Sequence, residues 1–462
     1  MRTDVQAQVP ESASVDPDWA WARYAPSDAQ PWTIQLAGHL YRRAGFGANF
    51  DELQRATNDG AQRVVDRLID FDADVPESYS AIQRDEQAAA RSGSIESLSA
   101  WWLRRMVETP FPLLEKMTLF WHSHFGIRAA EVKDASLMLE HVQRLRSFAL
   151  GKYPELLGGL ASDPAVFLGL GAQASRKNQP NEQFARQLMQ RLSVGAGNFG
   201  EEDVREASRA FTGWFVLRGK LRYFDREHDA GAKNILGHAG NWKLEDVVRI
   251  VLEHPVSANT LAVKLFRWFV SEVDEPSEAL LAPLVECSAD DYDIGRAVEM
   301  ILRSNLFYST AAYRRRIKSP VDFGVCIARA LEGNVSTTHL AADISSLGQG
   351  LYNPPTIEGW HGGRHWINTA TMVQRMNLAS ALLALGGRYG GKLDPNVIVS
   401  RYDAKDSAAA AKLIVDTLLQ SDWPEEQREV LWRAVPSSDI ADPSWLRSFT
   451  TSVLQSPVFQ LS

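Results

Sequence analysis

Hydrophobic positions recur at helical spacing through most of the chain from Thr33 onward. The segment 113–126 is typical, because its apolar side chains fall at i, i+4, i+7 and i+8 and form one stripe. Strand-like alternation is weak and is confined to residues 213–237, where Arg218-Gly219 can form the turn of a hairpin. The pattern predicts a mainly α fold, a large multi-helix body with at most a small β-hairpin.

Capping residues mark several helix ends. Asn181 and Ser319 each precede a periodic segment and are typical helix starts. Gly126, Gly195 and Gly213 follow periodic segments and are typical helix stops. These positions predict that the segments at 113–126 and 181–195 are separate helices.

The organisation of the chain suggests three parts. Residues 1–32 form an N-terminal arm rich in aromatic side chains, which we expect to pack across the body because a disordered tail seldom carries so many large rings. Residues 33–387 form the main helical domain. Residues 388–410 are the most turn-rich stretch, so we expect a C-terminal helical subdomain over 388–462.

Composition is that of an ordinary globular protein: 462 residues, 45% hydrophobic and 23% charged. This balance excludes a collagen-like or mainly disordered chain. Lys and Arg total 49 against 57 Asp and Glu, which gives a net charge of −8. An acidic chain is a poor candidate for non-specific nucleic-acid binding, so we expect no nucleic-acid partner.

Cysteine content and hydropathy bear on the compartment. Cys287 and Cys326 cannot build a disulfide framework, and their apolar neighbours predict inert buried thiols. The first residues lack the apolar core of a signal peptide, and no run of apolar residues is long enough for a spanning helix. We therefore expect a cytoplasmic protein without a membrane span.

Two histidines lie on the segment 113–126. His124 continues the apolar stripe, whereas His122 is rotated by about 200° toward the side of Glu115 and Thr118. Helical histidines at i and i+2 cannot chelate one metal ion, unless the helix ends before them, which Gly126 permits. One interpretation is a core histidine plus a surface one; the other is a catalytic or ligand role for both.

A second candidate lies on the segment 181–195. Glu182 and Arg186 stand at i and i+4, where opposite charges stabilise a helix slightly. Such a pair is usually a solvated surface pair. In a cleft, the carboxylate can instead act in catalysis or bind a metal ion, and the arginine can hold an anionic group.

A third candidate follows the predicted hairpin. Asp225, His228 and Asp229 offer oxygen and nitrogen ligands for a divalent metal ion, the possible cofactor. Their spacing matches no standard site, and a polar turn is an equal alternative. His361 and His365 lie four apart, but the glycines between them favour a tight, aromatic-lined loop over a chelating helix.

Several phrases together resemble one family, the bacterial domain-of-unknown-function 1800 proteins. They occur in the family's order and cover residues 33–380: HLYRRAGFG, FWHSHF, NEQFARQLMQ, EEDVREASRAFTGW, HDAGAKNILG and YNPPTIEGWHGGRHWINT. The resemblance implies a large, mainly helical protein. Many members are exported, and their frequent genomic companion is similar to sulfatases and alkaline phosphatases, the domain-of-unknown-function 1501 family. This chain has Gln187 and Gln190 where the family often has Glu, which weakens a cation site there.

Two functions follow from these observations. The first is a metal-assisted or acid–base hydrolase whose catalytic residues are His122, His124, Glu182 and Arg186, with the metal ligands named above. The alternative is a non-catalytic scaffold that positions a sulfatase-like partner, for which the 14 Trp are suitable anchors. The hydrolase requires that all three segments meet in one pocket.

Overall fold

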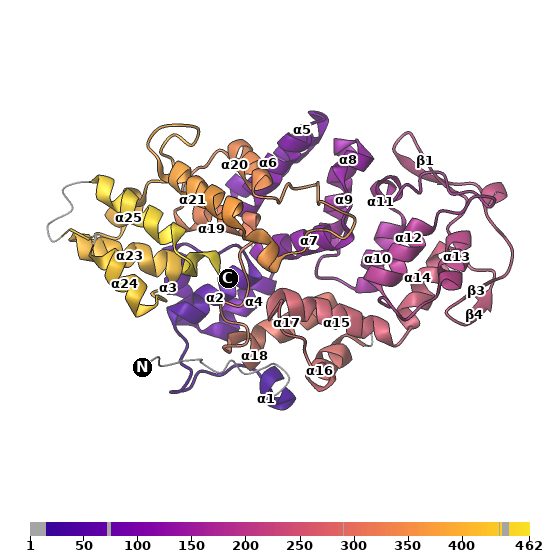
Figure 1. Cartoon of the computed structure of the whole chain (residues 1–462), viewed down its shortest axis with the longest axis horizontal. Coiled ribbons are helices and arrows are strands. Elements are labelled where there is room, and N and C mark those ends of the chain that lie inside the picture. Colours follow the sequence, from indigo (N-terminus) through magenta and orange to yellow (C-terminus); the bar gives the residue numbers. More distant parts are fainter. Residues whose placement is uncertain (1–14, 72–74, 290, 434, 437–442) are drawn as a thin grey trace.

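The computed structural model describes residues 15–71, 75–289, 291–433, 435–436 and 443–462. Helices build the molecule, as predicted (Figure 1). In the described residues, strands form two small antiparallel sheets, β1 (Trp214–Leu217) with β2 (Lys220–Tyr223) and β3 (Lys233–Ile235) with β4 (His238–Gly240). The first is the predicted hairpin, with its turn at Arg218-Gly219. The second is an addition that the alternation pattern was too short to indicate.

The helices run in chain order through three groups. The first group comprises α1 (Pro17–Trp21), α2 (Ile34–Ala44), α3 (Phe50–Asp59), α4 (Ala61–Ile69), α5 (Glu77–Arg91), α6 (Ile95–Glu108), α7 (Pro112–Phe125), α8 (Ala129–Val132) and α9 (Ala135–Ser147). The second comprises α10 (Tyr153–Ala161), α11 (Pro164–Gly169), α12 (Glu182–Gln187), the π-helical turn η2 (Leu188–Leu192), α13 (Glu201–Ala210), η3 (Asp225–Glu227) and α14 (Leu244–Glu253).

The third group begins with α15 (Val256–Phe269), α16 (Glu278–Ala289), α17 (Ile294–Arg303), α18 (Asn305–Tyr308), α19 (Pro320–Ala330) and α20 (Thr337–Ser346). It ends with η4 (Gly363–Trp366), α21 (Thr369–Leu383), α22 (Pro395–Arg401), α23 (Ser407–Leu419), α24 (Glu425–Trp432), α25 (Pro443–Gln455) and η5 (Val458–Gln460). In Figure 1 the hairpins and α23–α25 lie at opposite ends of the long axis, with α7 near the middle.

Local signals placed three helix ends correctly, whereas Gly195 and Gly213 each lie three residues beyond the last helical residue. The Asn181 side chain accepts a hydrogen bond from the N–H of Gln183 at 2.9 Å and so caps α12. Ser319 forms a capping box at the start of α19. Gly126 ends α7 in the left-handed conformation, at φ +63°.

The N-terminal arm packs on the body over its described residues, 15–32. The Trp21 indole is buried and donates a hydrogen bond to the Leu280 carbonyl at 2.6 Å. The ring of Tyr24 lies 4.6 Å from that of Tyr308. Residues 1–14 of the predicted arm lie outside the described part. The aromatic side chains thus hold the arm, as expected.

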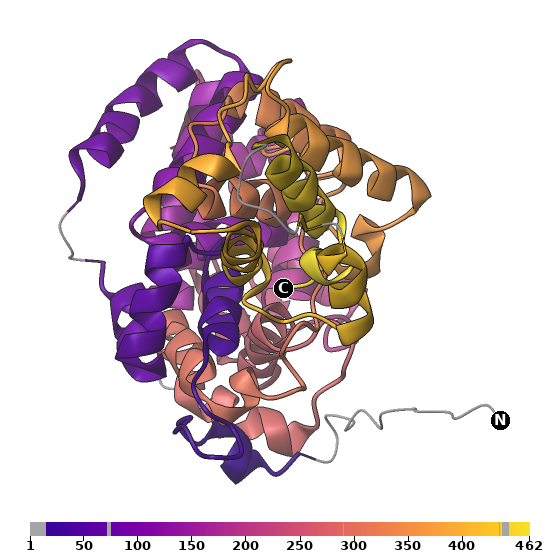
Figure 2. The ribbon, with the colours of Figure 1, turned by 90° about the vertical axis from the view of Figure 1, so that its left-hand side faces the viewer.

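The C-terminal helices pack directly on the rest of the molecule. Helix α23 contacts α2, α3 and α19, and α25 contacts α21. Figure 2 shows these yellow helices against the indigo N-terminal ones. The division at residue 388 stays a prediction, and the two sides of it share a packed interface.

Two other sequence-based expectations concern the cysteines and the membrane. Cys326 is buried as predicted, whereas Cys287 is only partly buried, and both are free thiols. None of the helices in the described ranges is both long and apolar enough to cross a membrane.

Candidate functional site

Helix α7 is buried on both faces because it packs against α2, α4 and α9. The interpretation that makes His122 a surface histidine is therefore wrong, since its side chain is fully buried. Its Nε2 accepts a hydrogen bond from the N–H of Tyr352 at 3.1 Å. Burial, with repulsion from His141, lowers the pKa of His122 to about 3, so the ring is neutral.

This hydrogen bond bears on metal binding. A neutral imidazole has one nitrogen lone pair, and in His122 the N–H of Tyr352 occupies it. A metal ion on Nδ1 would require a proton on Nε2, which would then face the Tyr352 N–H, another donor. His122 therefore holds the loop that follows α20 and does not fit a metal ligand.

Glu115, which lies on the same side of the helix as His122 in the sequence pattern, is a buried structural charge. Its carboxylate accepts hydrogen bonds from Trp102 at 3.0 Å, from Arg105 at 2.5 Å and from Arg146 at 2.9 Å. Burial raises the pKa of Glu115, but attraction to Arg146 and Arg105 outweighs this and lowers it to about 2. All its acceptor capacity is used, so it fixes α6 and α9 to α7.

His124 lies on the apolar stripe, as predicted, and meets a lysine that the sequence analysis did not consider. The Nζ of Lys264, on α15, lies 3.2 Å from Nε2 of His124 and also donates to the carbonyl of Arg191. The His124 ring is parallel to that of Phe120, at 5.9 Å, which fixes its orientation. Burial and the cations Lys264 and Arg191 keep the pKa of His124 well below its ordinary value, so the ring is a neutral acceptor.

Lys264 has an unusual environment for an ammonium group. In the described part of the chain, no carboxylate forms an ion pair with it, and the groups that affect it electrostatically are Arg191 and Arg267. Burial and these cations lower the pKa of Lys264 to about 7. A substantial fraction of this side chain is therefore a neutral amine at physiological pH.

A cavity of about 300 Å³ opens at this pair. Its charged, imidazole and indole side chains are His124, Arg191, Lys264, Arg267, Trp268, Glu272, Arg316, Glu358, Trp360, His361 and Trp366. Arg316 is paired with Glu272 at 2.7 Å, and Arg267 is paired with Glu275 outside the cavity. Among the described residues, Arg191 and Lys264 are the lining cations without a salt bridge, and the Glu358 carboxylate, which also lines the cavity, attracts Arg191 electrostatically. An anionic group can therefore bind to these two cations where it displaces or avoids Glu358.

Arg191, which lines the cavity, lies on backbone that is not α-helical. The α-helix α12 ends at Gln187 and continues directly as the π-helical turn η2, which carries Arg191. Its Nη1 donates to the carbonyl of Ile357 at 3.2 Å, and its own carbonyl accepts from Lys264. π-Helical turns are rare and frequent at functional sites. The spacing of residues does not indicate this π-helical turn.

The loop at 352–366 closes the cavity against the end of α7. Gly359 has φ +78°, and a Cβ there would overlap the carbonyl oxygen of Ser123. Gly126 likewise has no room for a Cβ beside the carbonyl of Ile357. These two glycines allow the backbones to touch, which places the ring of Trp360 at 5.5 Å from that of His122 and beside the cavity.

The predicted pair Glu182 and Arg186 lies elsewhere. Arg186 donates to Glu201 of α13 at 2.7 and 2.8 Å and approaches Glu182 at 3.5 Å. The Glu201 side chain is largely solvent-exposed, and those of Glu182 and Arg186 are partly exposed. They form a surface network, the alternative that the spacing had left open.

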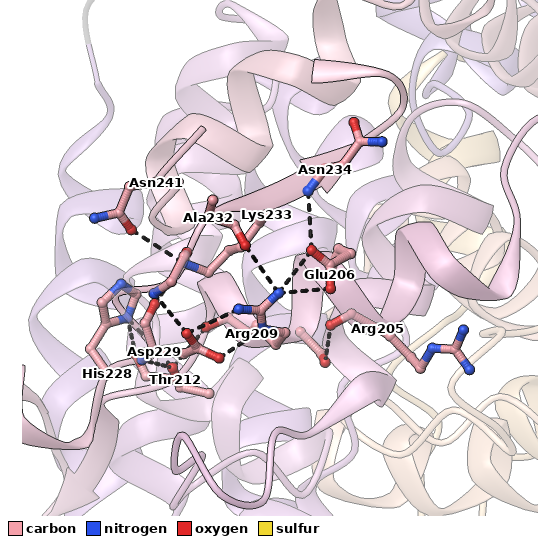
Figure 3. A network of polar contacts seen from close by, with 12 residues as sticks. Arg205, Glu206, Arg209, Thr212, His228, Asp229, Ala232, Lys233, Asn234 and Asn241 are labelled. Carbon is pink, nitrogen blue, oxygen red and sulfur yellow. Dashed lines mark hydrogen bonds and ion pairs between the residues drawn. The ribbon is translucent and has the colours of Figure 1, made fainter. Parts of the chain in front are cut away.

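The third candidate group also has its own partners (Figure 3). Both carboxylate oxygens of Asp229 accept from Arg209, at 2.7 and 3.1 Å, and these bonds lower the pKa of Asp229 to about 2. The Nδ1 of His228 donates to the carbonyl of Thr212 at 3.0 Å, and Asp225 is exposed. These contacts hold the loop after β2 on α13.

The three predicted groups therefore belong to separate polar networks. Within the described ranges, no cluster of three or more His, Cys, Asp and Glu side chains is placed to hold a metal ion. Of the predicted residues, only His124 lines the cavity at α15. Lys264 has one signal in the sequence, because it interrupts the apolar run LAVKLF of an amphipathic helix.

A larger groove, of about 940 Å³, lies between α3, α6 and α19. Its charged groups are already paired: Arg329 with Glu52 at 3.3 Å, and Arg104 with Glu108 at 3.1 Å. Arg329 also donates to the Val107 carbonyl at 2.9 Å. This groove offers no unpaired charge to a ligand, so the smaller cavity is the better candidate.

Comparison with known proteins agrees with the motifs. Three of the segments that carry the resemblance described above reach the cavity. Segment 120–125 supplies His124, segment 181–190 directly precedes Arg191, and segment 352–369 supplies Trp360. No curated protein and no solved structure matches the chain. A family described as "Protein of unknown function (DUF1800)" matches residues 39–461, nearly the whole sequence. The chain therefore belongs to the DUF1800 family.

Proposed function

We propose that this protein is an enzyme for a small anionic substrate and that the cavity between α7, α15 and the loop at 352–366 is its active site. The observation that carries the proposal is the position of Lys264 Nζ. It lines the cavity beside Arg191, lies 3.2 Å from the neutral imidazole of His124 and has no carboxylate partner in the described residues.

The chemistry follows from these three groups. Arg191 binds the anionic group of the substrate, because a guanidinium forms strong hydrogen bonds to carboxylate and phosphate oxygens. Lys264 exchanges protons near neutral pH, and His124 accepts a hydrogen bond from it and orients it. Proton transfer of this kind serves hydrolysis, the reaction class put forward from the sequence, as well as reactions of a carbonyl group.

The metal-assisted form of that hydrolase has less support. The nitrogen lone pair of His122 is occupied by Tyr352, and the Asp229 carboxylate is neutralised by Arg209. The donor atoms available at these positions therefore do not fit a divalent metal ion. The alternative role as a scaffold for a sulfatase-like protein stays a prediction, which co-purification with that partner tests.

The experiment is calorimetric titration of the protein with inorganic phosphate as the anion. Arg191→Gln removes a charge-assisted contact and should weaken phosphate binding by about tenfold or more. Arg186→Gln is the matched control: it lies five positions earlier, removes the same charge and belongs to the surface network. It should leave binding unchanged.

The two variants separate the two candidate sites. Equal loss of binding in both would indicate a general charge effect, and loss only in Arg186→Gln would favour the sequence-based site. Either result, or unchanged binding in a folded Arg191→Gln variant, refutes the proposal. Circular dichroism of each variant confirms that the fold is intact.

A further inference from the structure

The hydrogen bonds around Lys264 are compatible with a neutral amine. The structure gives Nζ two acceptors, His124 Nε2 and the carbonyl of Arg191. A neutral amine has two hydrogens and one lone pair, whereas an ammonium group has three hydrogens and no lone pair. When the amine is neutral and both hydrogens are directed to these acceptors, its lone pair is free to face the cavity that Lys264 lines.

From this arrangement we infer that Lys264 is a nucleophile and forms an imine with a small carboxylic acid that carries an aldehyde or keto group. This inference rests on the proposed function and names the substrate class for the same site. The carboxylate of such a substrate suits Arg191, and the indole rings of Trp268 and Trp360 supply apolar walls. The carbonyl carbon is the electrophile that an amine lone pair attacks.

The covalent step balances without an oxidant or a reductant. Nζ bonds to the carbonyl carbon, and the C=O π electrons move to oxygen. The proton that nitrogen must lose passes to His124 Nε2, within 3.2 Å, and from there to the new oxygen to give a carbinolamine. The carbinolamine hydroxyl then takes one further proton from solvent, the C–O bond breaks and water leaves, and the nitrogen lone pair forms the protonated imine, so the whole sequence consumes one proton from solvent.

Positive charge around the site assists each stage. The guanidinium groups of Arg191 and Arg267 disfavour a positive charge on Lys264 and so keep the free amine available. His124 remains a neutral acceptor in the same field. An imine with a bound carboxylate brings a negative charge to the cations, which compensates for the new iminium charge.

Reductive trapping tests the inference. The full-length protein is incubated at pH 7 with pyruvate and cyanoborohydride, and the adducts are located by peptide mass spectrometry. Lys264 should be modified at least about a hundredfold faster than the exposed Lys405, because an ordinary lysine is almost entirely protonated at this pH. Lactate, which has the carboxylate but no carbonyl, should form no adduct and should slow trapping by pyruvate.

Variants separate this inference from the proposed function. Lys264→Arg keeps the positive charge and has no nucleophilic amine, so it should still bind phosphate but give no adduct at that position. Equal modification of Lys264 and Lys405, or no adduct in wild-type protein that binds phosphate, overturns the imine while leaving the anion site in place. Failure of phosphate binding overturns the proposed function itself. The wild-type comparison of pyruvate with lactate decides the matter if Lys264→Arg does not fold.

Discussion

Replacing Lys264 with methionine should make the protein more stable at pH 6. Methionine has nearly the length of the lysine stem and carries no charge, so it fills the same space between α15 and α7 without the need to bury an ammonium group. A gain in stability from removing a polar residue is expected where the residue is kept for function. Loss of an ordinary buried contact would instead lower the stability of the protein.

The magnitude follows from the pKa. Lowering the pKa of Lys264 from 10.5 to about 7 corresponds to about 5 kcal/mol, at 1.36 kcal/mol for each pKa unit. This is the cost of keeping the side chain protonated in the folded protein. The substitution also removes hydrogen bonds to His124 and to the Arg191 carbonyl, worth about 1 kcal/mol each. The net gain at pH 6 is therefore about 2–3 kcal/mol.

The difference in stability between the methionine variant and the wild type should depend on pH. Between pH 7 and 10.5 the unfolded chain carries a proton on Lys264 that the folded protein lacks, so unfolding takes up a proton and wild-type stability rises with pH. The methionine variant lacks this contribution. Its advantage should shrink above pH 7 and reverse at about pH 9, so that at pH 10 the cost of the lost hydrogen bonds outweighs the advantage that remains.

Urea unfolding followed by circular dichroism at pH 6, 8 and 10 measures this difference. Other groups titrate in both proteins, so their contributions cancel when the two free energies of unfolding are subtracted. Lys405→Met, which removes an exposed lysine, is the matched control and should show little change. A Lys264→Met difference that is the same at pH 6 and pH 10 would refute the reasoning.

Three further predictions concern the surroundings of the site. Glu115→Gln should destabilise the protein by about 3–5 kcal/mol in urea unfolding, because Arg105 and Arg146 lose their buried partner. In the wild type, the stability that Glu115 contributes is fully present above pH 4.5 and should be lost as the pH falls toward 2. A variant as stable as the wild type would contradict this reasoning. Gly359→Ala should lower the melting temperature more than Gly348→Ala, which has a similar positive φ but open space around it; equal effects would show that the contact with α7 is unimportant. Asn181→Ala should cost about 1 kcal/mol through loss of the α12 cap, and an unchanged unfolding midpoint would exclude that role.

The sequence was a good guide wherever the determining contacts are local. Asn181 bonds two residues ahead and Gly126 ends its own helix, so both were identified from neighbouring residues. The turn at Arg218-Gly219 was placed for the same reason. The family was recognised because its motifs are contiguous phrases.

The site itself was only partly predictable, for a physical reason. Periodicity on one helix placed His124 correctly but could not show that side chains of α6, α9 and the loop at 352–366 surround His122 and bury it. Lys264 and Arg191 have no mutual spacing that signals a site, and the π-helical turn that directs Arg191 depends on packing against α15. Charged residues that looked alike, Arg186 and Arg191, differ only in what the fold places beside them.

The contacts at the end of α7 join parts of the chain that are synthesised at very different times. The hydrogen bond from Tyr352 to His122 spans 230 residues, and the contact between Lys264 and His124 spans 140. Closing such long loops costs chain entropy before any contact compensates for it, so these contacts are expected to form late in folding. During translation, before residues 352–366 have left the ribosome, the nascent chain already contains His122 and His124 but lacks the loop that covers them. Ligand occupancy would thus distinguish finished molecules from partly made ones.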